Sequence, residues 1–254
     1  PFIEKNLGWM LNPSLNYETI IEKKLNSKNN NFLNVKDLVK NEEKENYTRS
    51  VKNLIKEIDK GKLSKIVFSK KITLKRPNSN CVSIFKNILD SYNDAFCYFF
   101  YTPKEGVWLG ASPELLFKKE KNSILTMALA GTKFNISSEW GDKEYSEQKI
   151  VQDEIIENLS PLCSSLSLGE TETVSAGKIQ HLKTSFEGTT QASTIKLINA
   201  LFPSSAIAGF PRKTALKLIS KHESHERSFY SGFIGACKGN GSSFFVNLRC
   251  LNVK

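Results

Sequence analysis

The amino-acid sequence predicts an α+β protein in which antiparallel sheets are covered by outer helices. Its β-branched and aromatic runs are joined by tight turns at Pro103–Gly106 and Lys121–Ser123, which is typical of antiparallel strands. Other segments repeat apolar residues at helical spacing, and strands and helices do not alternate as βαβ units would. The chain has 254 residues, 39% hydrophobic and 24% charged, so it can bury the core of one large domain or two small ones.

The chain opens with a polar, Asn-rich segment, and we expect residues 1–45 to be a partly ordered lead-in. Residues 46–254 are then expected to form the structured domain. Its first helix is indicated by apolar residues at i, i+3, i+4 and i+7 over 51–58, and Gly61 supplies a helix stop.

The remaining elements follow from the same two periodicities, alternation for strands and a 3.6-residue repeat for helices. We expect a strand over Lys65–Leu74 and a helix over Val82–Leu89. Four strands should follow, over Ala95–Thr102, Val107–Ala111, Glu114–Glu120 and Ile124–Thr132. We then expect a long helix over Lys143–Leu159 and, after a Ser-rich loop, two strands within Thr173–Thr190. Two helices should follow, at Ala192–Leu201 and Arg212–His222.

The end of the chain predicts a β-hairpin, because Asn240-Gly241 stands between two alternating runs. In its second run Phe245, Asn247 and Arg249 share one face. We therefore expect a strand to hold Arg249 beside apolar residues, where a guanidinium needs an anionic partner.

The net charge, the cysteine content and the lengths of the apolar runs limit the classes of function that the protein can have. The net charge of +10 comes mostly from scattered Lys, with only five Arg and no nucleic-acid motif, so we expect no nucleic-acid partner and at most attraction for a small anion. The five Cys are scattered and form no CxxC pair, which favours reduced thiols in a cytoplasmic protein. No apolar run approaches the roughly 20 residues of a membrane span, and no signal-peptide pattern is present.

Several polar residues stand out because their neighbours are apolar or small: Lys65, Glu114, Gly131, Thr132, Glu144, Glu147, His181, Tyr230 and Arg249. Each also has an ordinary structural interpretation, such as a strand-end lysine, a solvated helix face for the two glutamates of the 143–159 helix, or a hydrogen-bonded core histidine. No spacing matches a zinc site, a phosphate loop, a dinucleotide fingerprint or a Ser-His-Asp triad.

Eight segments in order resemble the chorismate-utilising enzymes, and most closely the isochorismate synthases. The likeness extends from about Thr48 to the end. Its segments are KIVFSK (65–70), GASPELL (110–116), LAGT (129–132), KEYSEQ (143–148), QHLKT (180–184), FPSSAIAGFPR (202–212), HESHERSFYSGFIG (222–235) and NLRC (247–250).

The resemblance implies the family's α+β fold, with residues 46–254 as a chorismate-binding catalytic domain. It implies that Lys65 is the base that activates water for addition at C2 of chorismate, and that Glu114 is the acid that protonates the departing C4 hydroxyl. Anthranilate synthases carry glutamine at the position of Lys65, and aminodeoxychorismate synthases carry lysine at that of Ala130. Salicylate synthases share both the lysine and the alanine, so salicylate synthase stays an alternative, as does a non-catalytic basic binding protein.

The same resemblance implies that Tyr230 and Arg249 bind a substrate carboxylate, and that backbone at Gly131 and Thr132, with His181, lines the ring or the C1 carboxylate. It also implies Mg²⁺ as the cofactor, held by metal ligands that include Glu144 and Glu147 of the 143–159 helix. A further matching pair, Glu223 and Arg227, is interpreted as structural.

Family sequences continue past the NLRC strand into a Glu-rich helix that supplies further metal carboxylates, and this sequence stops at Lys254. We therefore expect a fold shortened at both ends, and weak binding of Mg²⁺ and chorismate by residues 1–254 alone. The expected protein is a cytoplasmic monomer without a membrane partner. Whether its isochorismate feeds a quinone or a siderophore is left open.

Overall fold

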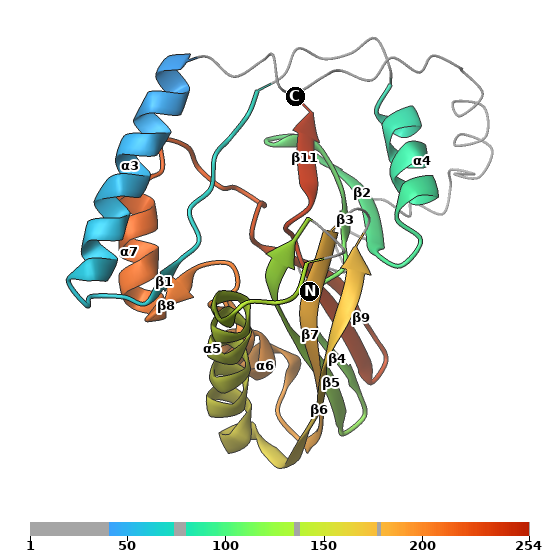
Figure 1. Ribbon diagram of the computed structural model, residues 1–254. Helices are drawn as coiled ribbons and strands as arrows, with labels where there is room; N and C mark the ends of the chain where they lie inside the picture. The colour runs from blue at the N-terminus through green and yellow to red at the C-terminus, as the bar shows by residue number, and fades with distance from the viewer. Residues whose placement is uncertain (1–40, 74–79, 135–137, 177–178, 254) are drawn as a thin grey trace.

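The computed structural model describes residues 41–73, 80–134, 138–176 and 179–253 (Figure 1). The predicted lead-in therefore lies almost entirely outside the described residues. Its last residues, 41–45, form the start of α3. The α-helices of the described residues are α3 (Asn41–Asp59), α4 (Cys81–Ser91), α5 (Asp142–Leu159), α6 (Thr194–Leu201) and α7 (Arg212–His222). None of the described helices combines the length and apolar character that crossing a bilayer requires.

The strands form three separate sheets, and every pairing within them is antiparallel, as predicted. The six-stranded sheet has the order β6-β7-β5-β4-β10-β9, with bounds Cys163–Ala176, Ile179–Thr190, Ser123–Lys133, Leu115–Glu120, Gly241–Val246 and Phe233–Lys238. The three-stranded sheet has the order β11-β3-β2, with bounds Cys250–Val253, Gly106–Ser112 and Phe96–Thr102. The two-stranded sheet pairs β1 (Lys65–Ile66) with β8 (Gly209–Phe210).

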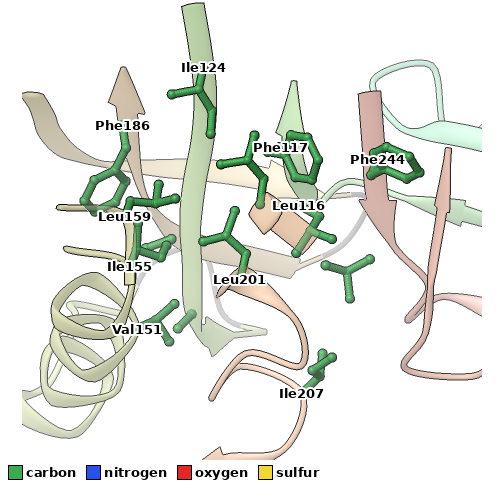
Figure 2. Packing of buried hydrophobic residues seen from close by; sticks show 14 residues of the cluster. Leu116, Phe117, Ile124, Val151, Ile155, Leu159, Phe186, Leu201, Ile207 and Phe244 are labelled. Atoms are coloured by element: carbon green, nitrogen blue, oxygen red, sulfur yellow. The ribbon is translucent and has the colours of Figure 1, made fainter. Parts of the chain in front are cut away.

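The main core lies between the six-stranded sheet and α5 with α6 (Figures 1 and 2). Val151, Ile155 and Leu159 recur every four residues along α5, so one side of the helix is apolar and is buried. They pack in one cluster with Ile124 of β5 and Phe186 of β7 (Figure 2). This packing fixes the C-terminal half of α5 to the sheet.

The two larger sheets meet at a corner where the chain crosses between them twice. One crossing runs from β3 to β4 through Pro113 and Glu114, and the other runs from β10 to β11 through Asn247–Arg249. The crossings are hydrogen-bonded to each other, because Val246 N donates to Glu114 O at 2.9 Å and Ala111 N donates to Arg249 O at 2.9 Å.

Asn247 ties this corner together and is only 2% exposed. Its side chain accepts a hydrogen bond from the Tyr98 hydroxyl and donates to Phe229 O at 2.7 Å. Its backbone N–H donates to Gly232 O at 2.8 Å, and its carbonyl accepts from Ser231 N at 2.7 Å. One buried amide therefore connects β2, the approach to β9 and the second crossing.

Three details of the predicted fold are wrong. The strand expected over Lys65–Leu74 is only Lys65–Ile66, because its continuation bonds to side chains of the 223–227 segment instead of to a neighbouring strand. The expected Ser-rich loop is part of β6, which pairs with β7 along its length and needs no apolar residues on its exposed side. Arg249 is not in the hairpin, since β10 ends at Val246 and the chain turns into the other sheet.

We predict that Asn247→Ala lowers the free energy of unfolding by about 2–4 kcal/mol, because it leaves the partly buried Phe229 carbonyl and the buried Tyr98 hydroxyl without this partner. Urea unfolding followed by circular dichroism measures the change. The exposed Asn93→Ala serves as the control and should stay within about 0.5 kcal/mol of the parent. A loss below about 1 kcal/mol for Asn247→Ala would contradict the role of this amide.

Candidate active site

The lysine at position 65 is held by the small β1–β8 sheet. Lys65 pairs with Phe210, and the flanking residues extend the pairing through Ser64 N to Phe210 O at 2.9 Å and Val67 N to Ala208 O at 3.0 Å. Gly209 has φ +127°, and a Cβ there would collide with the Lys65 carbonyl. Glycine is thus required for the two backbones to approach this closely.

An ion pair on the other side fixes the chain just after Lys65. Arg227 donates to both carboxylate oxygens of Glu223, at 2.8 and 2.6 Å. The same guanidinium donates to Val67 O at 2.7 Å, and Glu223 accepts from Ser69 N at 2.8 Å. Sequence reasoning interpreted Glu223 and Arg227 as a structural pair, and that interpretation is confirmed.

Glu114 enters the same region from the corner between the larger sheets. Its residue is 7% exposed. Burial raises the pKa of this carboxyl to about 7, and the positive charges of Lys65 and Arg249 oppose the shift without cancelling it. A glutamate with this pKa carries a proton in a large share of molecules near neutrality, so it can act as an acid.

Lys65 shifts in the opposite direction. Burial lowers the pKa of its ammonium group, against the attraction of Glu147, Glu114 and Glu154. Because each appears in the other's electrostatic environment, Lys65 and Glu114 share one partly desolvated region. The two predicted catalytic residues, carried by different sheets, are thus brought together.

Three more predicted residues meet beside a bulge in β5. The register shifts between Ala130 and Thr132, and Gly131 adopts φ +69°, a conformation that favours glycine. His181 of β7 lies opposite, with its Nδ1 2.9 Å from Gly131 O and 3.1 Å from Thr132 Oγ1. The predicted grouping of Gly131, Thr132 and His181 therefore exists in the structure.

His181 also contacts Arg249, at 2.9 Å between Nε2 and Nη2. Arginine can only donate, so this hydrogen bond assigns the Nε2 lone pair as the acceptor and places the imidazole proton on Nδ1, facing Gly131 O. Burial lowers the pKa of His181, Gly131 O opposes that shift, and Arg249 adds to it. The neutral imidazole thus orients the guanidinium, whose environment also includes Glu114.

Tyr230, which the resemblance pairs with Arg249 as a substrate ligand, contacts a different arginine. It stands in the turn before β9, with its ring 5.8 Å from the Arg227 guanidinium. Burial raises the pKa of its hydroxyl, and Arg227 opposes the shift. The described contacts place this ring against the Glu223–Arg227 pair.

Glu144 and Glu147 lie on the first turns of α5, as predicted. Glu144 Oε2 accepts from Gly141 N at 3.2 Å and caps the helix, while Glu147 is the strongest of the charges that act on Lys65. A Cβ on Gly131 would come 3.1 Å from Glu144 Cβ, so the start of α5 packs on the bulge.

The described residues contain no group of three or more His, Cys, Asp or Glu side chains able to hold a metal ion. Mg²⁺ usually takes only one or two protein carboxylates and completes its shell with water and substrate oxygens. The two glutamates of α5 fit that chemistry in number and ligand type.

Sequence reasoning missed one buried acid. Glu154 of α5 accepts from Ser205 N at 2.6 Å and lies 3.4 Å from Arg212 Nη2. The signal was available, because Glu154 sits between Val151 and Ile155 on the inward side of the predicted helix.

A half-buried lysine, a buried carboxyl with its pKa raised to about 7 and a guanidinium share one electrostatic environment in an antiparallel α+β fold, and groups of these kinds can perform acid–base chemistry. The chain belongs to the family described as chorismate binding enzyme, which it matches over residues 9–254. The predicted family and fold class are confirmed.

Among curated relatives, the isochorismate synthase MenF of Haemophilus influenzae is 29% identical over 214 residues, or 78% of this chain and 50% of the relative. MenF of Escherichia coli K12 is 28% identical over 227 residues, or 83% and 52%. The vibriobactin-specific isochorismate synthase of Vibrio cholerae is 26% identical over 242 residues, or 86% and 60%. This chain thus spans about half the length of the first two relatives.

Solved structures support the fold. MenF from Escherichia coli superposes with a TM-score of 0.69 at 22% identity, covering 83% of this chain and 52% of that one. Anthranilate synthase component I from Streptococcus pneumoniae TIGR4 gives 0.72 at 19% identity, covering 81% and 49%. One of these similar structures is named an isochorismate synthase and the other an anthranilate synthase component. The fold alone therefore does not identify the reaction.

We predict that Glu114→Gln changes how stability depends on pH. A carboxyl whose pKa is higher in the folded state than its ordinary 4.5 stabilises the fold below pH 4.5 and loses that contribution as pH rises through about 7. The Gln variant lacks this loss, so its stability relative to the parent should rise by about 2–3 kcal/mol between pH 5 and pH 8.

Urea unfolding at the two pH values gives this difference. The control is Glu157→Gln, which alters an exposed carboxylate on the outer side of α5 and should change the pH dependence little. A stability difference for Glu114→Gln that is flat with pH would mean that Glu114 is ionised throughout.

Proposed function

We propose that the protein converts chorismate to isochorismate, with Lys65 as the general base and Glu114 as the general acid. The observation that carries the proposal is the pair of opposite pKa shifts, which burial produces in two groups that influence each other. The relatives named isochorismate synthase support the same reaction.

The reaction needs one proton removed and one delivered. Neutral Lys65 takes a proton from water as the water oxygen attacks C2 of chorismate and the two conjugated ring double bonds shift toward C4. Protonated Glu114 gives its proton to the C4 oxygen, which leaves as water. Lys65 ends as an ammonium and Glu114 ends as a carboxylate. The site returns to its initial state when both groups exchange protons with solvent.

The remaining residues bind and orient. Arg249, hydrogen-bonded to His181, is proposed to bind a substrate carboxylate through charge-assisted hydrogen bonds, and Tyr230 is proposed to contribute a hydroxyl to the same carboxylate. The backbone at Gly131 and Thr132, next to His181, is proposed to line the substrate ring. Glu144 and Glu147 would hold Mg²⁺, which when bound supplies charge neutralisation for the second carboxylate.

We predict that Lys65→Gln lowers kcat by about 10²–10⁴-fold, because glutamine cannot accept the proton from water. The assay incubates the full-length protein with chorismate and Mg²⁺ and separates the products by chromatography. The exposed Lys71→Gln, in the segment that follows β1, is the matched control and should keep parental turnover.

The products also separate the alternatives. Isochorismate supports the proposal, salicylate with pyruvate would assign the salicylate synthase reaction, and no product would favour a binding protein. Full isochorismate output from Lys65→Gln would remove this lysine from the base role.

We predict that Arg249→Lys raises KM for chorismate by about 10-fold or more and changes kcat less, because lysine cannot form the two-pronged contact with a carboxylate. Steady-state kinetics over a range of chorismate concentrations measure both constants. A fall in kcat at unchanged KM would show that Arg249 acts on the transition state instead of on substrate binding.

A further inference from the structure

The sheet that carries Lys65 is separate from the two larger sheets, between which Glu114 lies. Within the described chain, β1 pairs only with β8, and neither strand joins the six-stranded or the three-stranded sheet. No ladder of backbone hydrogen bonds therefore fixes the lysine relative to the carboxyl. Figure 1 shows the small sheet at the lower ends of α3 and α7, away from the strands that lead to Glu114.

Glu154 bridges this separation. It is buried at 7% exposure on α5, and its Oε2 accepts from Ser205 N at 2.6 Å. Its Oε1 lies 3.4 Å from Nη2 of Arg212, which also donates to Ala200 O at 3.2 Å. Ser205 and Arg212 stand on either side of β8, so one carboxylate holds both ends of the segment that pairs with Lys65.

On the side of Glu114, the connection consists of α5 and the core of the six-stranded sheet. Glu154 is flanked by Val151 and Ile155, which pack into the core of the six-stranded sheet (Figure 2). That sheet contains β4, which begins at Leu115, the residue after Glu114. A continuous path of packed groups thus runs from Lys65 through β8 and Glu154 to α5 and on to Glu114.

We propose that Glu154 is a positioning residue that sets the placement of Lys65 relative to Glu114. The inference rests on the proposed function in naming those two as the reacting groups. Glu154 acts through Ser205 and Arg212 and need not touch the substrate. Its negative charge has a second effect, because with Glu147 and Glu114 it favours the ammonium form of Lys65 against burial.

A purely structural ion pair would behave differently. Loss of such a pair would lower stability, and the molecules that remain folded would keep their turnover. A positioning residue must instead change turnover in folded protein, because a displacement of about 1 Å in a reacting group costs on the order of 10²-fold in rate.

The test compares Glu154→Ala and Glu154→Gln with the control Glu157→Ala, which removes an exposed carboxylate from the same helix. Folded Glu154→Ala should lose about 10–100-fold in kcat, with KM within about threefold of the parent, because Arg249 lies outside the displaced unit. Glu154→Gln keeps an acceptor for Ser205 N and should recover most of kcat. With one acid fewer near Lys65, the acid limb of its kcat/KM profile should move to lower pH.

A second measurement needs no turnover. The ¹³Cε resonance of Lys65, assigned by its disappearance in Lys65→Arg, is titrated in ¹³C-lysine-labelled protein. In Glu154→Gln its midpoint should fall below that of the parent. This holds even if the protein forms no isochorismate, so failure of the proposed reaction and failure of this inference remain distinguishable.

Two results would overturn the inference. One is a folded Glu154→Ala protein with parental kcat. The other, decisive if Glu154→Ala does not fold, is a folded Glu154→Asp protein in which both kcat and the Lys65 titration equal those of the parent, because aspartate keeps the charge but shortens the reach to Ser205 N and Arg212.

Discussion

Burial of two opposite charges in one region, on elements from different sheets, is the constraint on which the rest of this structure depends. Desolvation penalises Lys65 as an ammonium and Glu114 as a carboxylate, and their mutual attraction only partly offsets it. Each group is thereby moved toward its neutral form, which is the form that a base and an acid need before a reaction begins. An exposed pair would hold ordinary pKa values and remain an ion pair without catalytic use.

A two-residue strand forms too few backbone hydrogen bonds to hold Lys65 in place, so side-chain contacts are needed as well. Glu223 and Arg227 fix the chain after Lys65, while Glu154 and Arg212 hold the opposing β8 segment. On the other side, Asn247 closes the corner from which Glu114 emerges. These polar groups are buried or nearly so, and their hydrogen bonds replace the ladder that the short sheet lacks. The structure thus places its polar interactions where its sheets are discontinuous.

Much of this could be predicted from local pattern. Local sequence patterns predicted helix α5, strands β2 to β5 and the Asn240-Gly241 turn, because each of these elements depends on residues close together in sequence. The end of β10 at Val246 was not, since alternation continues through Arg249 and only the tertiary corner interrupts it. Likewise, the resemblance assigned Lys65 and Glu114, whereas the partners of Glu154 lie 51 and 58 residues away in sequence.

The balance of charge explains why the site holds acids beside a base. Arg212 pairs with Glu154, His181 hydrogen-bonds to Arg249, and Glu147 and Glu114 belong to the electrostatic environment of Lys65. A carboxylate ion in this region would repel an anionic substrate. Under the proposed function, a proton on Glu114 removes one such charge, and a divalent cation held by the two glutamates of α5 would offset theirs. The proton that Glu114 is proposed to donate would then also favour the entry of an anion, so one pKa shift would serve both binding and chemistry.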